Sequence, residues 1–173
     1  GKLCAARGDD AMKRKPSPEA TEAWSRLMRV QGRVLSAVEQ DLKKAGFPPL
    51  AWYDALFELS RAEGGEMRPV ELERQMLIPQ YSTSRLIDRL VEEGLAVRRE
   101  CKLDKRGQYV EITQAGRELQ KSMWSAYAAA IERHIGSKLS DADAATLSGL
   151  LDRLGCSCDG APPAPLRDAA PVR

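Results

Sequence analysis

The stretch PQYSTSRLIDRLVEEGLAVRRECKLDKRGQYVEITQAG, residues 79–116, decides how this chain folds. It predicts a helix that begins at Pro79 with a polar, Ser/Thr-rich turn and ends at Gly94. Two strands, residues 95–100 and 108–113, are expected on either side of a basic turn. This order suits nucleic acid, because a helix fits the major groove of B-DNA while a charged hairpin tip reaches the backbone or the minor groove.

Charge supports this interpretation by its position rather than by its total. The 173-residue chain carries a formal net charge of only +2. The segment from Arg98 to Arg106, around the expected hairpin turn, nevertheless gathers cations that are opposed only by Glu100 and Asp104. A local basic tip on a nearly neutral protein is typical of a nucleic-acid contact. The cations are Arg98, Arg99, Lys102, Lys105 and Arg106.

Helices are predicted on both sides of this stretch. An amphipathic helix enters at Ser17-Pro18-Glu19 and runs to a break at Gly46, because its apolar residues recur at three- and four-residue steps. A second helix starts near Leu50, and Pro69 suits the first turn of a short third one. After the hairpin, the sequence predicts helices over 114–135, capped by Thr113, and from Ser140-Asp141 onward.

The predicted fold is therefore mainly α with a small β-hairpin wing. The first helix and the last two carry long apolar stripes that a small central domain cannot cover, so we expect them to pack against a second copy in a twofold homodimer. The expected organisation is a flexible arm, a dimerisation helix, a winged helix-turn-helix lobe, further dimerisation helices and a flexible tail. Their ranges are 1–18, 19–47, 48–113, 114–155 and 156–173.

Several segments resemble the MarR family of winged helix-turn-helix regulators. The resemblance rests on residues 72–77, 82–90 and 94–98, and on the pattern D-x-R-x-x-x-V-x-[LI]-T-x-x-G from Asp104 to Gly116. It covers about residues 23–154 and implies a dimeric regulator that binds palindromic DNA, usually as a repressor, and that is released by a small aromatic or phenolic acid or by cysteine oxidation. Pro79 and the bulky Tyr81 depart from the family pattern.

Two groups of residues are candidates for contacts with double-stranded DNA. At the start of the fourth helix, free N–H groups and short side chains let the helix approach phosphate, while Arg and Gln can read base edges. In the wing, the guanidinium of Arg106 suits a narrow minor groove, and Asp104 can fix its direction. Lysines there are expected to contact phosphates. The candidates are Gln80, Tyr81, Ser82, Ser84, Arg85, Lys102, Asp104, Lys105 and Arg106.

Two sensing mechanisms remain open. Aromatic and apolar residues of the first two helices are, as a group, candidates for a cleft that binds an aromatic acid, although ordinary core packing is the more common explanation for any single one of them. Alternatively, Cys101 lies among cations that lower the pKa of a thiol and raise its reactivity, although a passive strand residue is the simpler interpretation. The cleft candidates are Trp24, Met28, Gln31, Trp52, Tyr53 and Leu56.

The sequence argues against other classes of protein. It contains no nucleophile, base and orienting group at usable spacing, and His134 is its one histidine, so we expect neither an enzyme, nor a metal site, nor a cofactor. No apolar run reaches about 18 residues, and we expect a cytoplasmic protein without a membrane contact. A winged-helix module that binds a protein instead of DNA is the remaining alternative.

Overall fold

The computed structural model describes residues 15–78, 82–100 and 108–155, and the chain divides into two compact units, residues 1–36 and 37–173. The long helix α2 (Pro18–Lys44) begins in the first unit and ends in the second. Its N-terminus is capped as expected, because Ser17 Oγ accepts the N–H of Ala20 at 3.1 Å. The predicted mainly α fold with a small β-sheet is confirmed.

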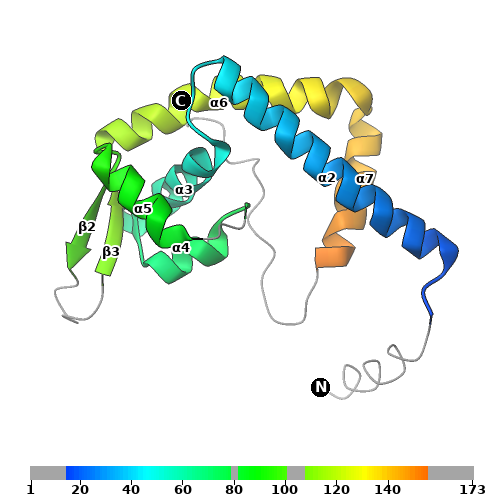
Figure 1. Ribbon diagram of the computed structural model, residues 1–173, viewed down its shortest axis with the longest axis horizontal. Coiled ribbons are helices and arrows are strands. Elements are labelled where there is room, and N and C mark those ends of the chain that lie inside the picture. Colours follow the sequence, from blue (N-terminus) through cyan, green and yellow to red (C-terminus); the bar gives the residue numbers. More distant parts are fainter. Residues whose placement is uncertain (1–14, 79–81, 101–107, 156–173) are drawn as a thin grey trace. The chain divides into compact units, whose positions relative to one another are not determined.

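The second unit contains a lobe of three helices and a sheet, which Figure 1 shows gathered together. Helix α3 (Leu50–Arg61) is followed by a 3₁₀ turn (Glu63–Gly65), the short strand β1 (Glu66–Met67) and α4 (Pro69–Gln75). Pro69 occupies the first turn of α4, as predicted. Helix α5 (Thr83–Glu92) then leads into β2 (Ala96–Glu100) and β3 (Gln108–Ile112).

The sheet has three antiparallel strands in the order β1-β3-β2, so the expected hairpin gains a third strand at its β3 edge. Val110 of β3 lies opposite Arg98 on one side and Met67 on the other. A strand of two residues has no alternation that a sequence pattern could reveal, which is why β1 was missed.

One apolar core joins these elements. Leu56 and Leu59 of α3 meet Leu72 of α4, and Ile87 and Leu90 of α5 close the layer against the sheet. Each of these side chains is fully buried, and burying one such side chain contributes about 1.5–3 kcal/mol. The core therefore holds α5 against α3, α4 and the sheet, and Leu119 of the helix that follows the hairpin also packs against it.

Two helices follow the hairpin. Helix α6 (Gln114–His134) begins at the predicted cap, where Thr113 Oγ1 accepts the N–H of Gly116 at 3.1 Å. After a 3₁₀ turn (Gly136–Lys138), α7 (Asp141–Gly155) begins with the N–H of Asp143 donating to Ser140 Oγ at 3.2 Å. Helix α6 packs on α3, whereas α7 has no buried residue.

Candidate nucleic-acid interface

Helix α5 is the candidate recognition helix, and its start differs from the prediction. The expectation that the helix begins at Pro79 is wrong, because the first helical residue is Thr83. Ser82 is the N-cap, and its Oγ accepts the N–H of Arg85 at 3.3 Å. Proline fits a first turn but has no side-chain acceptor, whereas a serine hydroxyl satisfies one of the free N–H groups. The predicted candidates Gln80 and Tyr81 lie outside the described residues.

The two faces of α5 separate cleanly. Thr83 faces the core and is 6% exposed, and its hydroxyl has no hydrogen-bond partner among the described residues. The opposite face exposes Ser84 and Arg85, which were both candidates. It also exposes Arg89, which the sequence analysis missed, although its place one helical turn after Arg85 puts both guanidinium groups on the same face.

One ion pair ties the base of the hairpin to α5, and a second one crosses the sheet. Arg98 Nη2 on β2 lies 2.6 Å from Asp88 Oδ1 on α5, and Arg98 also donates to Gln108 Oε1 at 3.3 Å. Arg99 Nε donates to Glu111 Oε2 at 2.7 Å across the sheet, and this carboxylate raises the pKa of Arg99. These two arginines therefore orient the hairpin by contacts within the chain.

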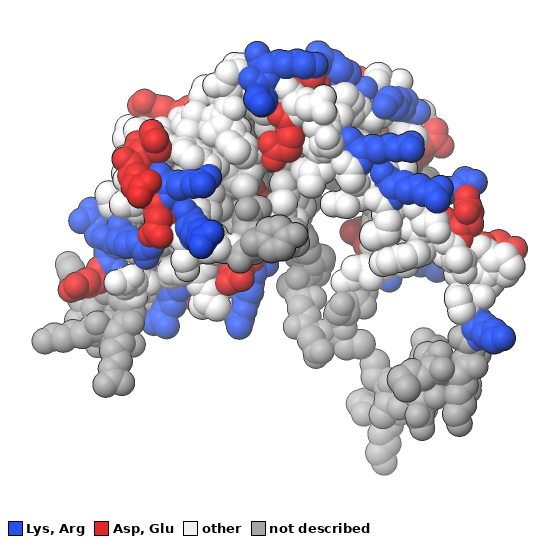
Figure 2. Space-filling view, in the orientation of Figure 1, with Lys and Arg blue, Asp and Glu red and all other residues white. Residues whose placement is uncertain are grey.

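The expected wing-tip candidates Lys102, Asp104, Lys105 and Arg106 lie outside the described residues, and so does Cys101. Over the described surface, Figure 2 shows Lys and Arg side chains interspersed with Asp and Glu on the face that it draws. A mixed surface of this kind agrees with the low net charge of the chain. It favours a few directed contacts over a broad electrostatic field.

Two glycines shape the connections around α5. Gly94 has a φ of +70°, which ends the helix and turns the chain into β2. Gly116, in the first turn of α6, lies so close to the hairpin that an added Cβ would meet the carbonyl oxygen of Leu95, and would lie 2.9 Å from Ile112 Cγ1. Thr113 completes this junction by donating its hydroxyl to the carbonyl of Gly94 at 2.7 Å.

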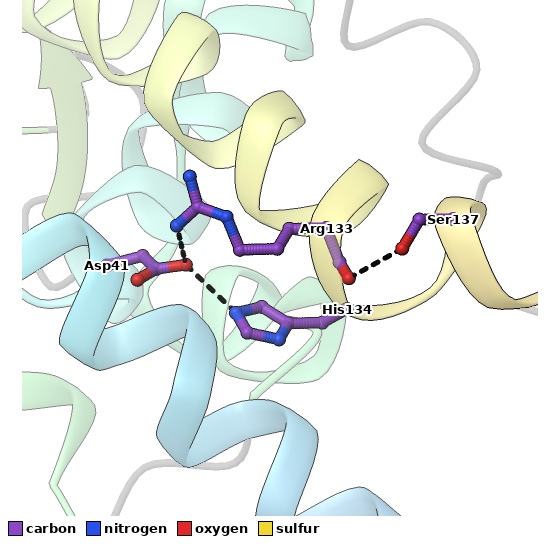
Figure 3. Close-up of polar contacts among 4 residues, drawn as sticks. All are labelled: Asp41, Arg133, His134 and Ser137. Atoms are coloured by element: carbon purple, nitrogen blue, oxygen red, sulfur yellow. Dashed lines mark hydrogen bonds and ion pairs between the residues drawn. The ribbon is translucent and has the colours of Figure 1, made fainter.

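Carboxylates near the end of α2 anchor it to α3 and α6. Glu39 accepts the N–H of Leu50 with both carboxylate oxygens at 3.2 Å, and so caps α3, whose own N-cap residue has no side-chain hydrogen bond. In Figure 3, Arg133 and His134 at the end of α6 point toward Asp41. Arg133 Nη1 and His134 Nε2 lie 2.8 Å and 2.9 Å from Asp41 Oδ2. The hydrogen bond with His134 and the charge of Arg133 lower the pKa of Asp41.

An aromatic cluster fills the contact between α3 and α6. Tyr53 stacks on Phe57 with ring centroids 5.9 Å apart, and meets the rings of Trp124 and Tyr127 at 6.2 Å and 5.1 Å. Burial raises the pKa values of Tyr53 and Tyr127 to about 12. Gln120 Nε2 donates to the Tyr53 hydroxyl at 3.3 Å, so the buried phenol is not left unpaired.

The six cleft candidates occupy different surroundings. Tyr53 and Leu56 are buried in the second unit, and Trp52 lies partly buried against its core. Trp24, Met28 and Gln31 belong to the first unit and are exposed there, with Trp24 at 62%. The common cleft therefore stays a prediction.

Two further properties concern the described residues alone. None of their helices is long and apolar enough to cross a membrane. Their His, Cys, Asp and Glu side chains also form no group of three or more that could hold a metal ion.

The lobe formed by α3, α4, α5 and the three-stranded sheet is a winged helix-turn-helix, with α4 and α5 as its helix pair. Residues 45–107 match the sequence model of the MarR family. No curated protein sequence matches the chain. Its fold and this match over the lobe support a winged-helix regulator of the MarR type, and the regulators of that family bind DNA and are not enzymes.

Solved structures, among them two MarR family transcriptional regulators from Streptomyces coelicolor, are similar to the chain. AbsC from Streptomyces coelicolor is 27% identical, with a TM-score of 0.69 over 82% of this chain and 95% of that chain. Sco3205 from the same organism, in complex with DNA, is 20% identical, with a TM-score of 0.73 over 82% and 89%. BpsR from Bordetella bronchiseptica, whose DNA binding is regulated by 6-hydroxynicotinic acid, is 20% identical, with a TM-score of 0.70 over 83% and 99%.

Proposed function

We propose that this regulator binds a palindromic operator as a homodimer and represses transcription in the cytoplasm. The observation that carries the proposal is the exposed face of α5, where Ser84, Arg85 and Arg89 lie on a helix whose opposite face is buried. A short residue lets the backbone approach the major groove, and arginine is the preferred reader of guanine. The similarity to Sco3205, solved in complex with DNA, supports this role.

The hairpin supplies the second contact in this proposal. Arg98 and Arg99 are engaged within the chain, so the tip residues Lys102, Lys105 and Arg106 carry the cations that remain for DNA, with Asp104 directing Arg106. Arginine in a narrow minor groove adds specificity, while lysines on phosphate add salt dependence. Gln80 and Tyr81 extend the contact of α5 by the same proposal.

Dimerisation supplies the spacing. The apolar residues of α7 are exposed, and α2 exposes Trp24, Met28 and Val30. Packing of these helices against a second copy buries both stripes and places two copies of α5 on one face. The two copies of α5 must then lie about 34 Å apart to enter successive major grooves of one operator.

The effector in this proposal is a small aromatic acid bound among Trp24, Met28, Gln31, Trp52, Tyr53 and Leu56. It changes the spacing of the two lobes, and affinity falls because the ligand favours a dimer that does not match the operator. The regulation of BpsR by 6-hydroxynicotinic acid supports an effector of this class. Oxidation of Cys101 is the alternative trigger, and a winged-helix module that binds a protein is the alternative function.

Selection of bound duplexes from a random pool tests the proposal. The wild-type protein should enrich a palindrome and bind it with a Kd on the order of 10⁻⁸ to 10⁻¹⁰ M. Arg85→Ala and Arg89→Ala should each weaken binding about tenfold and relax the preference at one base pair. Lys138→Ala removes one exposed cation outside the lobe and is the matched control. Failure to enrich any sequence at moderate ionic strength would favour the protein-binding alternative.

A further inference from the structure

The carboxylate of Asp54 is an unusual feature of the lobe. Asp54 lies in the middle of α3, is 4% exposed, and faces the segment that follows α4. A buried carboxylate costs free energy unless it is paired or hydrogen-bonded. No ion pair of Asp54 occurs among the described residues, so hydrogen bonds must satisfy it.

Those hydrogen bonds come from the turn of the helix-turn-helix. Asp54 Oδ2 accepts the backbone N–H of Ile78 at 2.9 Å, and the backbone of Leu77 is a second donor. Helix α4 has already ended, because the N–H of Met76 makes its last bond, to the carbonyl of Leu72 at 3.0 Å. The Asp54 contact therefore fixes the direction in which the chain leaves α4.

We propose that Asp54 is the positioning residue of the recognition helix, which acts by holding the turn at Leu77 and Ile78 against α3. Ile78 lies four residues before the N-cap Ser82, so a displaced turn moves the start of α5. That start carries Ser84 and Arg85, and base contacts tolerate little displacement. The role rests on the proposed DNA function, and Asp54 itself does not contact DNA.

The charge of Asp54 does not stabilise the fold at neutral pH, so the role proposed here differs from that of a stabilising ion pair. Burial raises the pKa of Asp54, while the N–H groups of Ile78 and Leu77 oppose that shift. A carboxyl whose folded pKa lies above its unfolded value stabilises the fold less as pH rises above about 4, because the charged form is disfavoured in the folded state. Asp54→Asn keeps an acceptor without the charge, and should raise the unfolding midpoint at pH 7.

The experiment compares variants on one duplex, selected from a random pool by the wild-type protein, and on a scrambled duplex of equal length. Asp54→Leu should weaken binding to the selected duplex about tenfold or more and leave the scrambled duplex within about twofold. Asp54→Asn should restore selectivity, because its amide oxygen can accept from Ile78. Glu58→Leu, which changes a partly buried carboxyl one turn later on α3, is the matched control and should bind as wild type.

The outcomes distinguish this inference from the function on which it rests. If the wild-type protein selects no duplex, the proposed function fails. If it does, and Asp54→Leu keeps wild-type selectivity, the positioning role is wrong while the function stands. Hydrogen exchange on the wild-type protein tests the contact without a substitution. The Ile78 amide should be protected, and exchange at the rate of an unstructured peptide would overturn the inference even if Asp54→Leu failed to fold.

Discussion

Helices α5 and α7 carry similar apolar residues in opposite surroundings. In α5, Leu86, Ile87 and Leu90 are 7%, 0% and 0% exposed. In α7, the exposure of the four leucines lies between 40% and 72%, and no residue of the helix is buried. The leucines of α7 are Leu147, Leu150, Leu151 and Leu154. The apolar stripe of α5 is thus buried within the chain, whereas the stripe of α7 is left exposed.

This difference teaches that the lobe and the terminal helix depend on different partners. The lobe has its own core and needs no second chain to hold α5 in place. The stripe of α7 contributes burial only when another surface covers it, and the homodimer proposed above supplies that surface. Substitutions in the lobe should therefore lower the stability of the fold, whereas substitutions in α7 should weaken the dimer.

The largest effect is expected inside the lobe. Gly116→Ala places a methyl group against the carbonyl oxygen of Leu95, and a backbone atom cannot give way as cheaply as the end of a flexible side chain. The free energy of unfolding should fall by about 2–4 kcal/mol in denaturant titration. Gly149→Ala in α7 is the control, because nothing lies within 4 Å of its added Cβ, and it should change stability by less than about 1 kcal/mol. Equal changes in the free energy of unfolding for the two variants would show that the lobe is not packed more tightly than α7.

The second prediction concerns α7. Leu147→Glu combined with Leu150→Glu introduces charge on the exposed stripe, so the lobe should unfold as in wild type while the dimer dissociates. Sedimentation should show a monomer at micromolar concentration, and affinity for the selected duplex should fall about a hundredfold, because two half-sites no longer bind together. Glu substitutions at the polar positions Asp143 and Ser148 are controls. A dimer that survives the leucine changes would show that α7 is not the interface.

The third prediction uses the contact in Figure 3. Asp41 has a lowered folded pKa, so its contribution to stability is present above its unfolded pKa of about 3.8 and is lost as pH falls through the lower folded value. Asp41→Asn should lower the unfolding midpoint at pH 7 and reduce the loss of stability in acid. Thermal unfolding between pH 2 and pH 7 measures both. An unchanged acid profile would mean that Arg133 and His134 do not hold this carboxylate.

The smallest effect is expected at the first residue of α5. The hydroxyl of Thr83 is buried without a hydrogen-bond partner among the described residues, so Thr83→Val removes an unsatisfied group and keeps the branched shape. Stability should rise by about 0.5–1 kcal/mol in denaturant titration. Ser84→Val, on the exposed face of the same helix, should bring no such gain. A loss of stability in Thr83→Val would mean that the hydroxyl has a partner in the folded protein.

Local signals made much of this fold predictable. Pro69 and Thr113 mark helix starts through their own backbone chemistry, and the apolar spacing from Trp24 to Leu42 predicts α2. The start of α5 was predicted wrongly because both Pro79 and Ser82 are good helix-start residues, and only the tertiary position of the turn decides between them.

The candidate interface was predictable only where one helix face carries it. Ser84 and Arg85 follow from the pattern of α5, and Arg89 could have been found by adding one helical turn. Asp54 gave no such signal, because its partner Ile78 is 24 residues away and offers only a backbone N–H, which every residue except proline has. Contacts of this kind depend on how α3 packs against the turn at Leu77 and Ile78, and a sequence pattern does not predict that packing.

The cap that Glu39 provides has a mechanical consequence. Leu50 is buried, and both oxygens of Glu39 accept its amide, so a rotation of the last turns of α2 either drags α3 along or strands that amide without a partner. Stranding a buried donor costs about 1–3 kcal/mol, which makes joint movement the cheaper course. A rotation of α2 is therefore transmitted to Asp54, one turn into α3, and through Asp54 to the recognition helix α5.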